Sequence, residues 1–263
     1  MGLTLAITGK GGVGKTTLAA MAVRWLSENG RGPVLAVDAD PNTNLDVLLG
    51  VRISSAVGSV REEVRQIAQG LPASTGGMGK QELLELKIQQ SLVETDRFDL
   101  LAMGRPEGPG CYCYANNVLG AAVRRLAGNY AAVVIDNEAG LENLSRRIVQ
   151  RVDALLFVAD ASTRGLTTAR RLYDLAEEMR IDAGTMGVVV NRVRGQAAAT
   201  GADDPLDLAN QLFENTRAPV VGSLPEDEEV IARDGAGEPI WTLPAANPLW
   251  KAAGGMFGKV MQP

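Results

Sequence analysis

The sequence predicts a doubly wound α/β fold in which a mostly parallel sheet is flanked by helices. Two observations lead to this prediction. Short apolar runs alternate with helical patterns along most of the chain, and a glycine-rich loop, residues 9–17, joins the first apolar run to the first helix. The length of 263 residues suits one large domain or two small ones. Because the chain shows no internal repeat, we predict a single domain, 1–263.

The elements follow in order along the chain. Strands are predicted at 3–8, 34–37, 98–103, 132–135, 155–159, 186–190 and 220–224. Helical patterns cover 18–26, 60–67, 82–93, 118–126 and 165–179. Residues 45–96 depart from the simple alternation, and a connector rich in Gly, Ser and Pro, 70–79, divides their two helices. We interpret this segment as a helical insertion after the second strand.

The glycine-rich loop has the spacing of a phosphate-binding loop. It reads Gly9-Lys10-Gly11-Gly12-Val13-Gly14-Lys15-Thr16-Thr17. Glycines allow the tight turn that points successive N–H groups at one anion, and the helix that opens near Gly14 adds its positive dipole end. Lys15 can then reach the β- and γ-phosphates, and the Thr16 hydroxyl can ligate Mg²⁺. We expect nucleotide binding by Gly11, Gly12, Val13, Gly14, Lys15, Thr16 and Thr17.

A second lysine in the loop, Lys10, indicates a particular class of nucleotide-binding protein. With it the loop resembles the deviant Walker A motif of dimerising ATPases, a superfamily that includes MinD, ParA, the nitrogenase iron protein and metal-insertion ATPases. The resemblance implies a P-loop NTPase fold of the MinD/nitrogenase iron-protein type. It also implies a homodimer in which Lys10 reaches the ATP or ADP bound by the other subunit.

Carboxylates follow two of the predicted strands. Asp38 and Asp40 follow the second strand, and Asp136 follows the fourth. Ligands bind beyond the carboxyl ends of strands in open α/β sheets, so these side chains should lie beside the phosphate loop and serve magnesium and water chemistry. The resemblance implies that Asp40 orients the attacking water, that Asp38 lies nearer the metal, and that Asp136 holds the magnesium water shell.

The end of the sixth strand carries a candidate for base recognition. Asn191, followed by Arg192, matches the asparagine that recognises adenine in this superfamily, and its amide offers the donor and the acceptor that an adenine edge requires. The resemblance also places Pro225 and Glu226, after the last strand, at the rim of the base site.

Composition restricts the class of protein. Lys plus Arg number 26 against 31 Asp plus Glu, a net charge of −5, which disfavours a duplex-binding protein. No apolar run reaches the ~18 residues of a membrane span, and the N-terminus enters a strand at once. The glycines in residues 249–263 disfavour a membrane-binding helix. We therefore expect a cytoplasmic protein that binds neither nucleic acid nor membrane.

The chain has no histidine and only two cysteines, Cys111 and Cys113. A disulfide between them is geometrically disfavoured, and adjacent thiols in a reducing cytoplasm indicate metal or redox work, although two thiols without a role remain an alternative. One pair supplies two of the four ligands of a tetrahedral site. Two subunits could together bind Zn²⁺ or Ni²⁺ between them.

Four blocks resemble the accessory ATPases of carbon monoxide dehydrogenase, the CooC-type nickel-insertion family. They are residues 9–17, 37–45, the Cys111-Tyr112-Cys113 motif and 136–147. The resemblance implies an ATP-dependent homodimer that delivers nickel to carbon monoxide dehydrogenase. This chain has Asn143 where many members carry histidine. Two alternatives are an iron–sulfur carrier of the nitrogenase iron-protein type, since four thiolates also suit a [4Fe–4S] cluster, and a ParA-like DNA partition switch.

Overall fold

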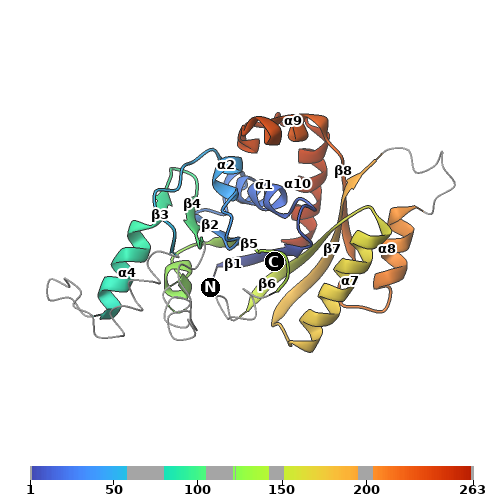
Figure 1. Ribbon diagram of the computed structural model, residues 1–263, viewed down its shortest axis with the longest axis horizontal. Helices are drawn as coiled ribbons and strands as arrows, with labels where there is room; N and C mark the ends of the chain where they lie inside the picture. Colours follow the sequence, from blue (N-terminus) through green and yellow to red (C-terminus); the bar gives the residue numbers. More distant parts are fainter. Residues whose placement is uncertain are drawn as a thin grey trace.

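A twisted, eight-stranded sheet forms the centre of the described chain (Figure 1). The computed structural model describes residues 2–57, 80–104, 121, 123–141, 151–194 and 204–261. The strands are β1 (Leu3–Gly9), β2 (Val34–Asp38), β3 (Leu92–Glu94), β4 (Asp99–Ala102), β5 (Ala132–Asp136), β6 (Val152–Asp160), β7 (Ala183–Val193) and β8 (Val220–Pro225). Their order is β3-β4-β2-β5-β1-β6-β7-β8.

All neighbouring strands pair in parallel except β3, which pairs antiparallel with β4. The central strands β1, β2 and β5 are almost entirely apolar because helices cover both of their faces. β1 lies between β5 and β6, so the loop that follows it opens at the middle of the carboxyl edge of the sheet. This confirms the predicted doubly wound, mostly parallel α/β fold.

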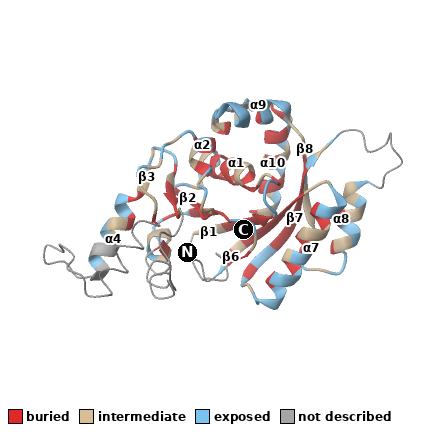
Figure 2. Cartoon of the chain, in the orientation of Figure 1, coloured by how far each residue is buried: buried red, intermediate tan, exposed pale blue. Residues whose placement is uncertain are grey.

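Helices cover the two faces of the sheet in two groups (Figures 1 and 2). One apolar core includes residues of α1 (Lys15–Glu28), α2 (Leu45–Leu49), α9 (Glu228–Ala236) and α10 (Pro248–Val260). The short 3-10 helix Ile240–Thr242 also contributes to this core. The other core includes residues of α4 (Lys80–Gln90), α7 (Thr163–Glu178) and α8 (Pro205–Phe213). Alternate residues of each strand enter opposite cores.

The predicted helix at 82–93 is wrong at its carboxyl end. Helix α4 stops at Gln90, and Leu92–Glu94 form the edge strand β3. Val93 pairs with Leu100 of β4, so pairing with the sheet overrides the local helical pattern. The insertion after the second strand therefore contains a strand as well as helices. The helix predicted at 60–67 lies outside the described residues.

The glycine-containing tail does form a helix, α10, and its apolar side is turned inward. Leu249, Trp250 and Phe257 are buried, and the guanidinium of Arg24 on α1 lies 4.2 Å from the centre of the Trp250 ring. This packing directs the large apolar side chains of α10 into the protein. No helix among the described residues has the length and apolar character to cross a membrane.

Candidate functional site

The phosphate loop connects β1 to α1 through glycines in the left-handed region of φ. Gly12 has a φ of 79° and Gly14 a φ of 93°, values that other residues rarely adopt. A Cβ on Gly14 would also lie 2.4 Å from Nδ2 of Asn191. Helix α1 begins at Lys15, so its first N–H groups and its positive dipole end face the loop. The structure thus has the backbone cradle that a phosphate group requires.

Lys15 is turned into the loop. The residue is only 7% exposed, and its Nζ donates a hydrogen bond of 3.1 Å to the carbonyl of Lys10. Burial lowers the pKa of Lys15, while the negative charges of Asp136, Asp40 and Glu138 act in the opposite direction. A buried ammonium group surrounded by carboxylates is placed to receive phosphate oxygens. Lys10 itself is exposed.

Asp136 ends β5 on the same side of the sheet as α1. It is almost fully buried, and neither carboxylate oxygen has a hydrogen-bond partner in the described part of the chain. Burial, helped by the neighbouring Asp38 and Asp40, raises the pKa of Asp136 to about 7. The Thr16 hydroxyl and Lys15 oppose this shift, although the hydroxyl lies outside hydrogen-bonding geometry. An unpartnered buried carboxylate beside a hydroxyl fits a hydrated magnesium ion, which prefers oxygen ligands.

Asp38 lies opposite Asp136 in the register of β2 and β5. Its carboxylate accepts hydrogen bonds from the N–H groups of Asp40 and Leu45, each at 3.0 Å. Burial raises the pKa of Asp38 to about 6, while these two bonds lower it. Asp40 is half-buried at the start of the following loop. The structure therefore gathers Lys15, Thr16, Asp38, Asp40 and Asp136 at one edge of the sheet, as expected.

Two connections that the sequence analysis missed attach the loop after β5 to β1. The backbone N–H and the Nδ2 of Asn137 both donate to the carbonyl of Ile7, at 3.1 and 3.0 Å. The Thr8 hydroxyl donates to the carbonyl of Gly140 at 2.7 Å. Because Thr8 directly precedes the phosphate loop, these bonds join that loop to residues 137–140. A polar residue at the end of the strand, directly before the glycine-rich loop, is the signal that could have drawn attention to Thr8.

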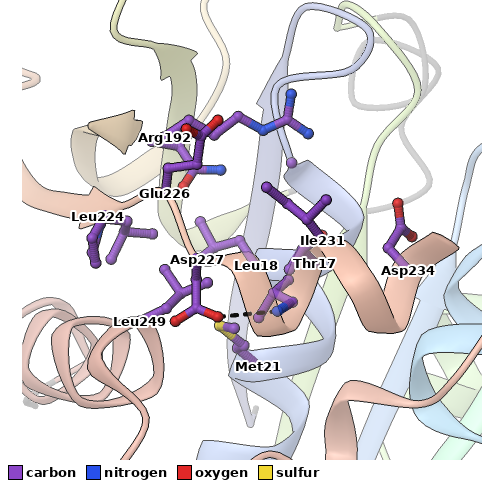
Figure 3. A pocket seen from close by; sticks show the side chains of 14 residues that line it. Thr17, Leu18, Met21, Arg192, Leu224, Glu226, Asp227, Ile231, Asp234 and Leu249 are labelled. Carbon is purple, nitrogen blue, oxygen red and sulfur yellow. Dashed lines mark hydrogen bonds between the residues drawn. The ribbon is translucent and has the colours of Figure 1, made fainter. Parts of the chain in front are cut away.

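The residues expected around adenine line one pocket beside the phosphate loop (Figure 3). Its walls come from α1, the ends of β7 and β8, and α9, and they include Gly14, Thr17, Leu18, Met21, Asn191, Arg192, Leu224, Pro225, Glu226, Asp227 and Ile231. Asn191 Nδ2 donates to the carbonyl of Val13 at 2.8 Å. Arg192 has a φ of 57°, a left-handed value that is unusual outside glycine.

An ion pair at the rim of this pocket was not foreseen. Arg194 forms a bidentate pair with Glu226, with N–O distances of 2.6 and 3.2 Å, and this hydrogen-bonded pairing lowers the pKa of Glu226. Asp227 caps α9 by accepting the N–H of Val230 at 3.0 Å and also accepts Nδ2 of Asn247 at 2.9 Å. The rim is thus held by the residue that follows β7 and by the residue that caps the start of α10.

The comparison with known families agrees with this geometry. A family model described as the CobQ/CobB/MinD/ParA nucleotide binding domain matches residues 4–240. The chain belongs to this family. Its members are nucleotide-binding P-loop ATPases, which is the class that the glycine loop predicted.

Individual relatives cover nearly the whole chain. An uncharacterised ATP-binding protein of Methanocaldococcus jannaschii is 41% identical over 251 residues, 95% of this chain and 94% of the relative. The carbon monoxide dehydrogenase accessory protein CooC of Rhodospirillum rubrum is 30% identical over 254 residues, 93% of this chain and 91% of the relative. Among solved structures, the MinC:MinD cell division protein complex of Aquifex aeolicus matches with a TM-score of 0.71 and 25% identity, covering 98% of this chain and 95% of that one.

Membership of the CobQ/CobB/MinD/ParA family does not test the predicted metal site at the two cysteines. Cys111 and Cys113, and also Asn143, lie outside the described residues. Within the described ranges, no three acidic or cysteine side chains come together as a set of metal ligands. The predicted thiolate site therefore remains a prediction.

Proposed function

We propose that this protein is a magnesium-dependent ATPase whose nucleotide cycle opens and closes a homodimer, and that it delivers nickel to carbon monoxide dehydrogenase. The observation that carries the ATPase part is the presence of two buried groups at the mouth of the phosphate loop: the ammonium group of Lys15, and the carboxylate of Asp136, which has no hydrogen-bond partner in the described part of the chain. A buried cation and a buried, unsatisfied anion side by side suit a phosphate group and its magnesium ion.

The chain's own residues divide the chemistry between them. The loop N–H groups and Lys15 bind the phosphates and stabilise the charge that develops during cleavage. Thr16 and Asp136 would hold a hydrated magnesium ion, which would neutralise phosphate charge. Asp40, half-buried beside them, orients the attacking water. The side chain of Lys10 is exposed on the single chain, where the nucleotide of a second copy can approach it.

Nickel delivery rests on two sequence observations. The relative from Rhodospirillum rubrum named as a carbon monoxide dehydrogenase accessory protein covers 93% of this chain, and the chain carries the Cys111-Tyr112-Cys113 motif. Nickel is the cargo, so the thiolates of two subunits must bind it and then release it. ATP-driven closure and hydrolysis-driven opening would supply the change of state that such release requires.

Activation of nickel-free carbon monoxide dehydrogenase tests this function. The client enzyme is incubated with a limiting amount of Ni²⁺ and the protein, together with ATP or ADP, and its carbon monoxide oxidation is followed. We expect ATP to accelerate activation and the variants Cys111→Ser and Cys113→Ser to remove the acceleration. Activation no faster than with Ni²⁺ alone would reject the nickel role while leaving ATP hydrolysis in place.

A colour test separates the iron–sulfur alternative. Four thiolates from two subunits would also hold a [4Fe–4S] cluster. Anaerobic purification without added nickel should give a colourless protein. A brown protein with four irons per dimer would replace the nickel proposal with a cluster carrier.

A further inference from the structure

The side chain of Asp38 is bonded to its own loop. It is fully buried, its Oδ1 accepts the N–H of Asp40 at 3.0 Å, and its Oδ2 accepts the N–H of Leu45 at 3.0 Å. One carboxylate therefore connects the start of the loop 39–45 with the first residue of α2. The ends of this loop are thereby fixed relative to β2.

The loop between these two bonds is tightly turned. Oδ1 of Asp40 accepts the N–H of Asn42 at 2.8 Å, and the carbonyl of Asp40 accepts the N–H of Thr43 at 3.2 Å. Thr43 has a φ of 47°, a left-handed conformation that is costly for a β-branched residue. Such a conformation persists only where surrounding contacts over-determine it, and the two bonds of Asp38 are such contacts.

The neighbouring Asp136 differs from Asp38 in its hydrogen bonding. Asp38 and Asp136 lie directly opposite each other on β2 and β5, and both are buried. The described residues leave both oxygens of Asp136 unpartnered, whereas each oxygen of Asp38 holds a backbone N–H. Two carboxylates at the same level of the sheet thus have different bonding, which indicates different roles.

We propose that Asp38 is a positioning residue that sets the carboxylate of Asp40 in place before nucleotide binds. The inference rests on the proposed role of Asp40 in orienting water. It assigns to Asp38 the geometry of the 39–45 loop, and it assigns the magnesium water shell to Thr16 and Asp136. Displacements of about 1 Å at a reacting group can cost about 10²-fold in rate, so loss of this positioning should be measurable.

The variant Asp38→Asn tests the proposal because it keeps the shape of the side chain and one acceptor oxygen, but turns an amide group toward one of the two N–H donors. We expect turnover to fall about 10- to 100-fold, with the affinities for ATP and for magnesium within twofold of wild type. The matched control is Asp204→Asn. Asp204 caps α8, on the other face of the sheet, by accepting the N–H of Leu206 at 2.9 Å.

A double-mutant cycle with Asp40→Asn shows whether Asp38 acts through Asp40. If it does, Asp38→Asn causes no further loss in the Asp40→Asn background. An equal loss in both backgrounds overturns the proposal, and so does recovery of Asp38→Asn turnover at high magnesium, which would make Asp38 a metal ligand. Wild-type turnover of Asp40→Asn alone would instead reject the proposed role of Asp40, and that outcome is seen without any Asp38 variant.

Amide hydrogen exchange in the nucleotide-free wild-type protein gives a measurement that needs no variant. The N–H groups of Asp40 and Leu45 should exchange well below the rates of an unfolded chain, because both are hydrogen-bonded to Asp38. In Asp38→Asn at least one of them should lose protection while α1 and the sheet keep theirs. Exchange of both groups at unfolded-chain rates in wild type overturns the proposal, even if the variant cannot be purified folded.

Discussion

The side-chain amide of Asn191 donates a 2.8 Å hydrogen bond to the carbonyl of Val13, joining residues 178 positions apart. Asn191 ends the part of β7 that borders β6, and Val13 lies inside the phosphate loop. The contact therefore connects the wall of the proposed base pocket to the phosphate cradle. The side chain of Asn191 can approach the loop this closely only because residue 14 has no side chain, since a Cβ there would lie 2.4 Å from Nδ2 of Asn191.

This contact predicts the effect of Gly14→Ala. The new methyl group would clash with Asn191, and alanine disfavours the φ of 93° at this position, a strain of about 1–3 kcal/mol. We expect ATP affinity to fall at least tenfold, measured by calorimetric titration. The control is Gly255→Ala on α10, where a Cβ meets nothing within 4 Å and ATP affinity should not change. Equal ATP affinity in both variants would contradict the described loop geometry.

Asp40→Ala should bind ATP and fail to cleave it. The water would lose its orienting carboxylate, and loss of one preorganised group typically costs about 10² to 10³ in rate. Phosphate release under saturating ATP and magnesium measures turnover. Turnover at the wild-type rate in Asp40→Ala would remove Asp40 from the mechanism.

Lys15→Ala should lose both ATP affinity and turnover, because Lys15 contacts the phosphates before and during cleavage.

Lys10→Ala should bind nucleotide but lose the ATP-induced dimer. The Lys10 ammonium is exposed in the single chain, and a charge-assisted contact with the partner's phosphates forms only on docking. Multi-angle light scattering with and without ATP measures the change in mass. Lys259→Ala, which removes an exposed lysine from α10, should dimerise as wild type does. The same ATP-dependent mass in Lys10→Ala and wild type would reject the role of Lys10.

Metal titration should give one zinc or nickel ion per two chains. One chain offers two cysteines and no histidine, whereas two chains offer the four thiolates of a tetrahedral site. Because the thiols must lose protons to bind, affinity should decline as the pH falls. Reduced protein is titrated with Zn²⁺ or Ni²⁺, and Cys111→Ser or Cys113→Ser should abolish binding. A full equivalent per chain that persists in these variants would exclude the cysteines.

The stability of the nucleotide-free protein should fall between about pH 4 and about pH 7. Burial raises the pKa of Asp38 from 3.8 to about 6 and that of Asp136 from 3.8 to about 7. A carboxyl group with a raised pKa in the folded state favours folding when protonated. Its contribution is complete below pH 3.8 and is lost as the pH rises through about 6 and 7, with a slope of at most about 1.4 kcal/mol per pH unit for each group.

Thermal unfolding in EDTA, in wild type and Asp136→Asn, isolates the contribution of Asp136. The midpoint of wild type should decrease more steeply with pH than that of Asp136→Asn, since asparagine does not ionise. Asp204→Asn, which alters an exposed carboxylate, should follow wild type. Parallel curves for wild type and Asp136→Asn would show that Asp136 ionises as readily in the folded chain as in the unfolded one.

Local patterns in the sequence predicted the parts of this protein that depend on neighbouring residues. Glycine spacing predicted the loop of Gly12 and Gly14, and apolar runs predicted seven of the strands within the described residues. The same patterns were wrong at 92–93, because the three-residue strand β3 carries too little local signal and pairing with β4 decides its conformation. The helix α10 in the tail also depends on tertiary contacts, since packing on α1 and β8 stabilises it despite its glycines.

The sequence by itself determined which residue types stand at the carboxyl ends of the strands, because strand ends follow from local apolar periodicity. Only the tertiary structure decided how those residues are bonded. It leaves Asp136 unpartnered while Asp38 holds its own loop, and it pairs Arg194 with Glu226, 32 positions further along the chain. The reason is physical: the order of the strands sets which distant residues meet, and burial at that meeting point sets the cost of an unpaired charge.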